Sequence, residues 1–172
     1  MTEVSGDDSR QPVVVLMCGV AGSGKTTYAQ RLEADGYVRL SIDEEIWARF
    51  GRYGIDYDPI AYPEYGPIAE AHLRLRLLDL IAEGRDVVVD SSFWQRSSRE
   101  ECKELIEGSG ARWRLIYLDA APALLRRRLA QRGLRFDANA AFFPIDEATL
   151  TRFLSGFEVP KGEGEEVIIV SG

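Results

Sequence analysis

The sequence has no long hydrophobic run, few cysteines and a single histidine, and these absences exclude whole classes of protein. The apolar segment at residues 13–18 is far shorter than the about 20 residues that a membrane-spanning helix needs. The two cysteines, Cys18 and Cys102, show neither a disulfide framework nor a metal-ligand spacing. Residues 1–11 are polar and acidic and do not resemble a signal peptide, so we expect a cytoplasmic protein without membrane contact.

Positive charge is also scarce, because 21 lysines and arginines face 28 aspartates and glutamates, which gives a net charge of −7. A surface with this excess of negative charge does not attract nucleic acid, although a local basic cleft could. Hydrophobic residues make up 45% of the 172 residues, enough for one α/β domain with a substantial core. We expect residues 1–11 to be a flexible tail and residues 12–172 to form a single domain.

Residues 19–26 read GVAGSGKT and have the spacing G-x-x-x-x-G-K-T of a phosphate-binding P-loop. A segment typical of a buried strand, residues 13–18, precedes the motif, and a helix-compatible stretch, residues 27–32, follows it. Strand, glycine loop and helix is the order that the motif requires. The alternative, a glycine-rich turn with a chance lysine, fits this combination of motif and context poorly.

The P-loop pattern predicts a nucleoside triphosphate site. Glycines allow successive backbone N–H groups to point at phosphate oxygens, and the helix that follows adds its positive end. Lys25 would reach the β- and γ-phosphates, and the Thr26 hydroxyl would ligate Mg²⁺. No N-K-x-D segment that would recognise guanine appears, so we expect ATP. The predicted nucleotide-binding residues of the loop are Gly19, Ala21, Gly22, Ser23, Gly24, Lys25, Thr26 and Thr27.

Aspartates follow two predicted strands, residues 37–41 and 86–90. Carboxyl ends of strands face the ligand crevice of an open α/β sheet. Asp43 could accept the proton of a hydroxyl that attacks the γ-phosphate, or it could cap the helix at residues 44–50, and its position fits both roles. Asp90 lies where a Walker-B carboxylate holds Mg²⁺, with Ser91 and Ser92 beside it. A capping role for Asp90 is weaker, because the next predicted helix begins several residues later.

Two further segments carry possible functional residues. Residues 51–67 are rich in glycine, tyrosine and proline, and could form an acceptor pocket with aromatic walls that include Tyr57, or a connector that covers the core. The helix expected at residues 122–132 carries an unusually dense run of arginines. Arg128 and Arg132 are four residues apart and share a face, so they could form a lid over the transferring phosphoryl group rather than a solvated charge run.

The remaining pattern completes an α/β fold with five parallel strands flanked by helices and a small arginine-bearing lid. Helices are expected at residues 68–83 and 97–107, a strand at 112–119, a loop at 133–145 and another helix through Phe157. Residues 167–170 are expected to be the last buried strand. His72, near the start of the first of these helices, is more typical of a surface position than of a catalytic one.

The assembled motifs resemble the P-loop kinases of the polynucleotide-kinase-like group, small kinases that are often labelled AAA-type. The resemblance covers about residues 13–170 and rests on GVAGSGKTT, LSIDEEIW, VVVDSSF, RRRLAQRG and PIDEATLTRFLSGFE. Chloramphenicol phosphotransferase and the zeta-toxin kinases share this layout with other acceptors. The resemblance implies that Lys25, Arg128 and Arg132 act on the donor phosphates, that Asp43 is the general base, and that Asp90 and Ser91 lie near the metal and the acceptor.

One position departs from the polynucleotide kinases, in which an arginine follows the catalytic aspartate by three residues. This sequence has Ile46 there, and Arg49, one turn later, could replace the missing charge. Together with the acidic composition, this favours a small hydroxylated acceptor. The leading hypothesis is an ATP-dependent phosphotransferase with an alcohol acceptor. A polynucleotide 5′-hydroxyl kinase and a regulatory ATPase without an alcohol acceptor are the alternatives, and the sequence leaves the acceptor and the oligomeric state open.

Overall fold

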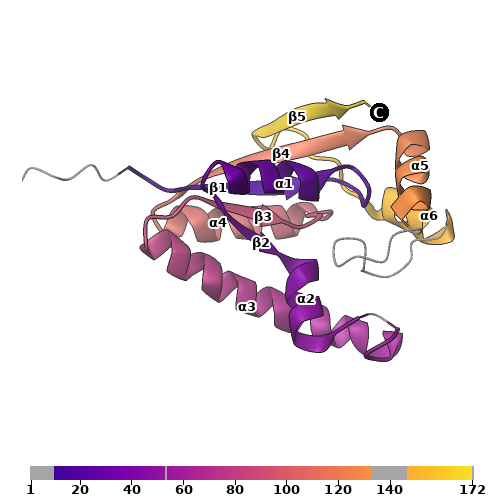
Figure 1. The fold of residues 1–172 in the computed structure, drawn as a ribbon. Helices are drawn as coiled ribbons and strands as arrows, with labels where there is room; N and C mark the ends of the chain where they lie inside the picture. Colours follow the sequence, from indigo (N-terminus) through magenta and orange to yellow (C-terminus); the bar gives the residue numbers. More distant parts are fainter. Residues whose placement is uncertain (1–9, 53, 133–146, 172) are drawn as a thin grey trace, which may run out of the picture.

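The core of the protein is a parallel sheet of five strands in the order β2-β3-β1-β4-β5 (Figure 1). The computed structural model describes residues 10–52, 54–132 and 147–171. The strands are β1 (Val13–Cys18), β2 (Val38–Ser41), β3 (Val87–Asp90), β4 (Arg112–Ala120) and β5 (Glu165–Val170). The expected α/β class with five parallel strands is confirmed, and the central strand β1 carries the P-loop at its carboxyl end.

Helices cover both faces of the sheet. Helix α1 (Lys25–Ala34) packs its buried Ala29 against one face, over side chains of β1, β3 and β4. Helices α3 (Tyr62–Ala82) and α4 (Arg96–Gly108) cover the other face through residues such as Leu80 and Ile106. Both faces of β1 are therefore buried, which explains why its sequence is apolar throughout rather than alternating.

The remaining elements gather near the carboxyl ends of the strands (Figure 1). Helix α2 (Ile42–Phe50) begins directly after β2, and the short 3₁₀ helix η1 (Pro59–Ala61) leads into α3. Helices α5 (Pro122–Arg132) and α6 (Glu147–Gly156) pack together through Leu125, Leu129 and Leu150, against the P-loop residues Val20 and Ala21. This end of the sheet is therefore where a ligand meets the largest number of elements.

The structure corrects the expected start of one helix and the expected burial of the last strand. Helix α3 begins at Tyr62 and not near residue 68, because a proline is tolerated in a first turn and Pro67 is accommodated inside the helix. Strand β5 is not fully buried. It is an edge strand paired only with β4 among the described strands, and Val167 and Ile169 are 51% and 73% exposed.

Some expectations fall partly or wholly outside the described residues. The predicted loop at 133–145 and most of the predicted tail lie there. The described end of that tail is held in place, because Arg10 pairs with Asp86 at 2.6 Å and the Val13 N–H donates to the same carboxylate. His72 is exposed, as expected. None of the described helices is long and apolar enough to cross a lipid bilayer.

Both cysteines are expected to be chemically inert in the folded protein. Burial raises the pKa of Cys18 and that of Cys102 to about 11, so very little thiolate exists at neutral pH. Iodoacetamide should therefore leave both unmodified in the native protein and alkylate both after unfolding, as measured by mass spectrometry. Rapid native labelling of Cys18, whose side chain is wholly buried, would contradict the packing around β1.

Candidate functional site

A cavity of about 980 Å³ lies around the P-loop at the carboxyl edge of the sheet. This volume is at the upper end of the about 300–1,000 Å³ typical of small-molecule sites, so a nucleotide and a second ligand both fit. Loop residues 20–27 line the cavity together with residues from α2, α3, α5, α6 and the segment after β3. The polar and aromatic residues of the lining include Asp43, Tyr62, Asp90, Ser91, Ser92, Trp94, Arg128, Phe153 and Phe157.

The P-loop has the backbone that phosphate binding requires. Gly22 and Gly24 have φ angles of 88° and 102°, which side-chain-bearing residues rarely adopt. The Lys25 ammonium donates to the carbonyl oxygens of Gly19 at 2.9 Å and Val20 at 3.2 Å. These contacts hold the ammonium over the loop, where phosphate oxygens would replace the carbonyls as its acceptors. The predicted nucleotide residues up to Gly24 thus lie in the loop, and Lys25, Thr26 and Thr27 form the first turn of α1.

Thr26 and Asp90 meet across the cavity floor. The Thr26 hydroxyl donates to Asp90 Oδ2 at 3.0 Å, and Asp90 is only 5% exposed at the end of β3. The N-cap residue of α4 is Gln95, so Asp90 does not cap this helix. No cluster of three or more acidic, histidine or cysteine side chains exists among the described residues that could hold a metal alone. A Mg²⁺ ion here would take its other ligands from phosphates and water, which is the usual way this ion is held.

Arg39 is a site residue that sequence reasoning missed. Its guanidinium, with a side chain only 7% exposed, donates to Asp90 Oδ2 at 3.0 Å and also pairs with Glu44 of α2. Burial by itself lowers the pKa of Arg39, but the hydrogen bond to Glu44 and the charges of Glu44, Asp90 and Glu33 raise it overall. Arg39 therefore links Asp90, the predicted metal ligand, to the helix that carries Asp43. No local signal in the sequence marks it, because an arginine in a half-buried strand that also contains the polar Ser41 is ordinary.

Asp43 lies in the first turn of α2 and lines the cavity. The capping position belongs to Ser41, whose hydroxyl accepts from the Glu44 N–H at 3.3 Å. Ser41 also pairs in register with Asp90 across β2 and β3. The alternative role of Asp43 as a helix cap is therefore wrong, and its carboxylate stands two residues beyond the strand end that adjoins the predicted metal ligand.

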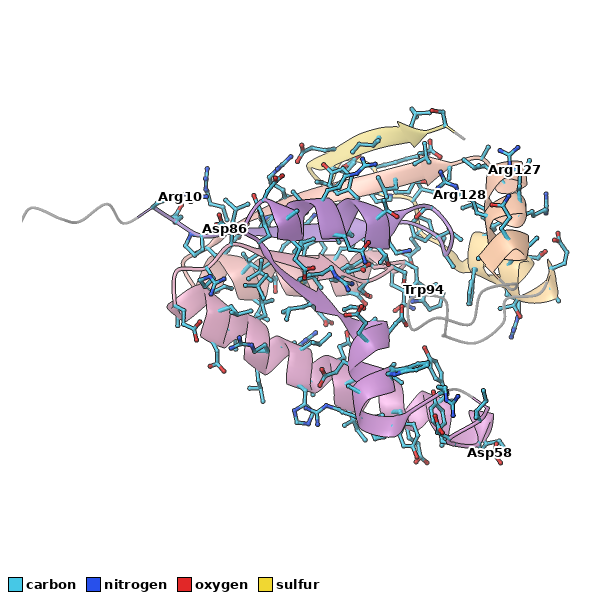
Figure 2. All side chains as sticks on the ribbon, viewed as in Figure 1. Arg10, Asp58, Asp86, Trp94, Arg127 and Arg128 are labelled. Atoms are coloured by element: carbon cyan, nitrogen blue, oxygen red, sulfur yellow. The ribbon has the colours of Figure 1, made fainter. Side chains whose placement is uncertain are left out.

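Arg128 of α5 reaches the P-loop directly. Its guanidinium donates to the Gly22 carbonyl at 3.2 Å and lines the cavity, close to where the phosphates of a bound nucleotide would lie (Figure 2). The side chain of Arg132 lies outside the described part of the structure. Arg126 instead pairs with Glu147 at 2.8 Å at the surface. Of these two arginines, only Arg128 therefore contacts the P-loop.

Arg49 and Tyr57, both expected near the acceptor, are not among the described residues that line the cavity. Arg49 pairs with Glu45, one turn back on α2. Tyr57 packs edge-on against Tyr65 at 5.0 Å, and Tyr65 stacks on Phe50 at 3.8 Å. These tyrosines pack against one another, as in the connector interpretation. The aromatic residues that line the cavity are instead Tyr28, Tyr62, Trp94, Phe153 and Phe157.

A search of known families matches residues 14–160 to a family described as an AAA domain. One curated relative, a UPF0200 protein of Pyrobaculum aerophilum, is 32% identical over 120 residues. The match covers 70% of this chain and 66% of that protein. Its name gives no activity.

Solved structures share the fold. A candidate kinase from Chloroflexus aurantiacus has a TM-score of 0.72 at 20% identity and covers 93% of this chain and 89% of its own. A chain of the Pnkp1/Rnl/Hen1 RNA repair complex has a TM-score of 0.70 at 18% identity, and 88% of this chain matches 45% of that one. A gluconokinase from Sinorhizobium meliloti has a TM-score of 0.59 at 22% identity, covering 95% of this chain and 85% of its own. This chain thus spans less than half of the matched chain of the RNA repair complex, and likeness at these identities establishes the fold alone.

Proposed function

Because this chain belongs to the AAA domain family and has the fold of P-loop kinases, we propose that it transfers the γ-phosphoryl group of ATP to a hydroxyl of a small molecule. The observation that carries the proposal is the position of Asp43. A carboxylate that lines the same cavity as the P-loop lysine and the Thr26–Asp90 pair can accept a proton from an alcohol facing the γ-phosphate.

Each positively charged side chain near the position of the donor phosphates has a proposed role. Lys25 and Arg128 would neutralise charge on the transferring phosphoryl group, and Arg132, four residues along α5, is proposed to assist from the lid. Thr26 and Asp90 would hold Mg²⁺, which would supply positive charge next to the phosphates. The backbone N–H groups of residues 22–26 fix the phosphates, so most of the catalysis is positioning and electrostatic stabilisation.

The acceptor half of the site lies on the other side of the γ-phosphate position. Ser91 and Ser92 line the cavity after Asp90 and offer hydroxyl groups to an acceptor alcohol. The Gly19 N–H donates to the Ser92 carbonyl at 3.1 Å, which fixes this segment against the P-loop. Arg49 and Tyr57 are not among the described residues that line the cavity, and we do not assign them to the acceptor.

The decisive experiment is a transfer screen with γ-labelled ATP and Mg²⁺ against hydroxylated metabolites and 5′-hydroxyl oligonucleotides. We expect labelled small-molecule product from the wild type and none from Lys25→Ala. ATP hydrolysis that no candidate acceptor stimulates would contradict the kinase proposal and indicate a regulatory ATPase.

A 5′-hydroxyl polynucleotide kinase is the second candidate, favoured by the structural likeness to a chain of the Pnkp1/Rnl/Hen1 RNA repair complex. Ile46 is 5% exposed and apolar where that group has an arginine, which leaves no charge there for a nucleic-acid phosphate. Salt-sensitive binding of oligonucleotides would support this candidate. A gel shift that stays negative at low salt would exclude it.

Replacing Thr26 by alanine should raise the Mg²⁺ concentration needed for half-maximal transfer by at least about tenfold, because the ion loses a protein ligand. The measurement is a Mg²⁺ titration of the transfer rate at saturating ATP. Nucleotide binding in the absence of Mg²⁺ should change little, since the backbone of the loop is untouched. An unchanged Mg²⁺ requirement would show that the ion is held elsewhere.

A further inference from the structure

Trp94 is partly exposed to solvent and lines the cavity. It is 46% exposed, although large aromatic side chains are usually covered in a folded domain. It follows Ser91 and Ser92 in the segment between β3 and α4, and lines the same cavity as Asp43 (Figure 2). An exposed indole at the edge of a polar site is a common feature of ligand binding.

The backbone before Trp94 is strained. Phe93 has a φ of 45°, the only positive value at a described residue other than glycine, and such conformations persist only where surrounding contacts impose them. The buried Arg99 donates to the Phe93 carbonyl at 2.7 Å and so helps to hold this conformation. Phe93 packs against the core, whereas the next residue, Trp94, lines the cavity. This backbone conformation therefore accompanies different placements of two successive aromatic side chains, one against the core and one at the cavity.

The Trp94 indole also packs closely against Gly156 of α6. A Cβ atom at Gly156 of α6 would lie 2.8 Å from Trp94 Cζ3, so a side chain there would push the ring away. The Glu158 N–H donates to the Trp94 carbonyl at 2.8 Å, and the Glu158 carboxylate accepts from the Arg96 N–H. Glu158 thus fixes the backbone at Trp94 and at Arg96, and α6 lies against the indole. A rigid aromatic side chain loses little conformational entropy when a ligand binds.

The position of Trp94 points to the acceptor rather than to the donor. Trp94 follows β3, and β3 adjoins β2, the strand that leads to Asp43. Phe153 and Phe157 line the cavity from the α6 side, and Tyr62 lines it from α3. The acceptor half of the cavity therefore combines a carboxylate and hydroxyl groups with several aromatic faces.

We propose that Trp94 is the specificity-determining residue for the acceptor, and that a flat conjugated ring of the acceptor stacks on its indole. The acceptor would then be a small molecule with both a hydroxyl and such a ring, such as a nucleoside or an aryl alcohol, rather than an open-chain polyol or sugar acid. Stacking on an aromatic side chain tolerates many ring types, so the hydroxyl geometry at Asp43 would supply the remaining selectivity. This inference rests on the proposed kinase function.

Its first test compares transfer to adenosine and benzyl alcohol with transfer to gluconate and xylitol. The wild type should prefer the ring-bearing pair. Trp94→Leu should raise KM for these acceptors by about tenfold with a smaller change in kcat, whereas Trp94→Phe should keep most of the affinity. Gly156→Ala, which displaces the indole without removing it, should resemble Trp94→Leu. Preference for the open-chain pair with an unchanged KM in Trp94→Leu would overturn the inference and leave the kinase proposal intact.

The second test does not need transfer. Tryptophan fluorescence of the wild type, with ADP and Mg²⁺ present, should change saturably on titration with adenosine and not with xylitol. The change should persist in Trp47→Phe and disappear in Trp94→Phe. A response to ADP alone, with none to the acceptor probes, would assign the indole to the donor and overturn the inference. A response to adenosine without any transfer would support the ring site and contradict the kinase proposal.

Discussion

Asp43→Asn should lower the rate of phosphoryl transfer by about 10²–10⁴-fold, the range that a positioned general base contributes. Asparagine keeps the size of the side chain but cannot accept the alcohol proton at neutral pH. Because the P-loop, Thr26 and Asp90 are unchanged, the Kd for ATP should remain close to that of the wild type. The measurements are kcat for the acceptor found in the screen and nucleotide affinity by calorimetry.

Glu45→Gln is the matched control for this variant. Glu45 lies two residues further along the same helix turn and pairs with Arg49, and neither residue is among the described lining of the cavity. It removes one carboxylate from α2 without touching the site, so transfer should be essentially unchanged. If Asp43→Asn transferred phosphate at the wild-type rate, Asp43 would not be the base.

Glu163→Gln should destabilise the fold by about 3–5 kcal/mol, the cost of breaking a buried ion pair by removing one partner. Both oxygens of Glu163 accept from Arg99, Nε and Nη2 each at 2.9 Å, and both side chains are almost wholly buried. Lys103 donates to the Glu163 carbonyl at 2.8 Å. Removing the carboxylate leaves the Arg99 charge buried and uncompensated. Unfolding by urea, followed by circular dichroism, measures the loss.

Glu166→Gln is a control with the same chemistry at the surface. Glu166 also makes a two-point contact with an arginine, Arg114, but both side chains are over 40% exposed, at 48% and 43%. Exposed ion pairs contribute about 0–1 kcal/mol, so this variant should unfold near the wild-type urea midpoint. Equal losses in the two variants would show that burial is not what gives the Arg99–Glu163 pair its importance.

The contribution of Glu163 should also depend on pH. The hydrogen bonds from Arg99 hold the pKa of Glu163 below its ordinary value of 4.5. A group whose pKa is lowered by folding stabilises the folded state fully above its unfolded pKa and loses that effect as the pH falls. The stability difference between the wild type and Glu163→Gln should therefore be constant above pH 4.5 and shrink in more acidic solution. A difference that grew on acidification would contradict the pairing.

Local patterns in the sequence determined the fold class and the residues proposed for the donor half of the site. The P-loop spacing, the apolar β1 segment and the acid at the end of β3 are contiguous features, and the Thr26–Asp90 contact follows once parallel strands bring their carboxyl ends to one edge. The sequence left open whether Asp43 caps α2 or faces the cavity. The structure places the cap at Ser41 and leaves Asp43 in the lining of the cavity.

Contacts between distant segments decided the acceptor half. Nothing local distinguishes Arg39 or Trp94 from ordinary strand and loop residues, because their roles depend on Asp90, Gly156 and Glu158, which are 51, 62 and 64 positions away in the chain. The same reason explains why Arg49 and Tyr57 were expected at the site, since composition shows that charges and rings are available but not what each one packs against. A sequence records local propensity directly, whereas the partner of a side chain is fixed only when the whole sheet and its helices are packed.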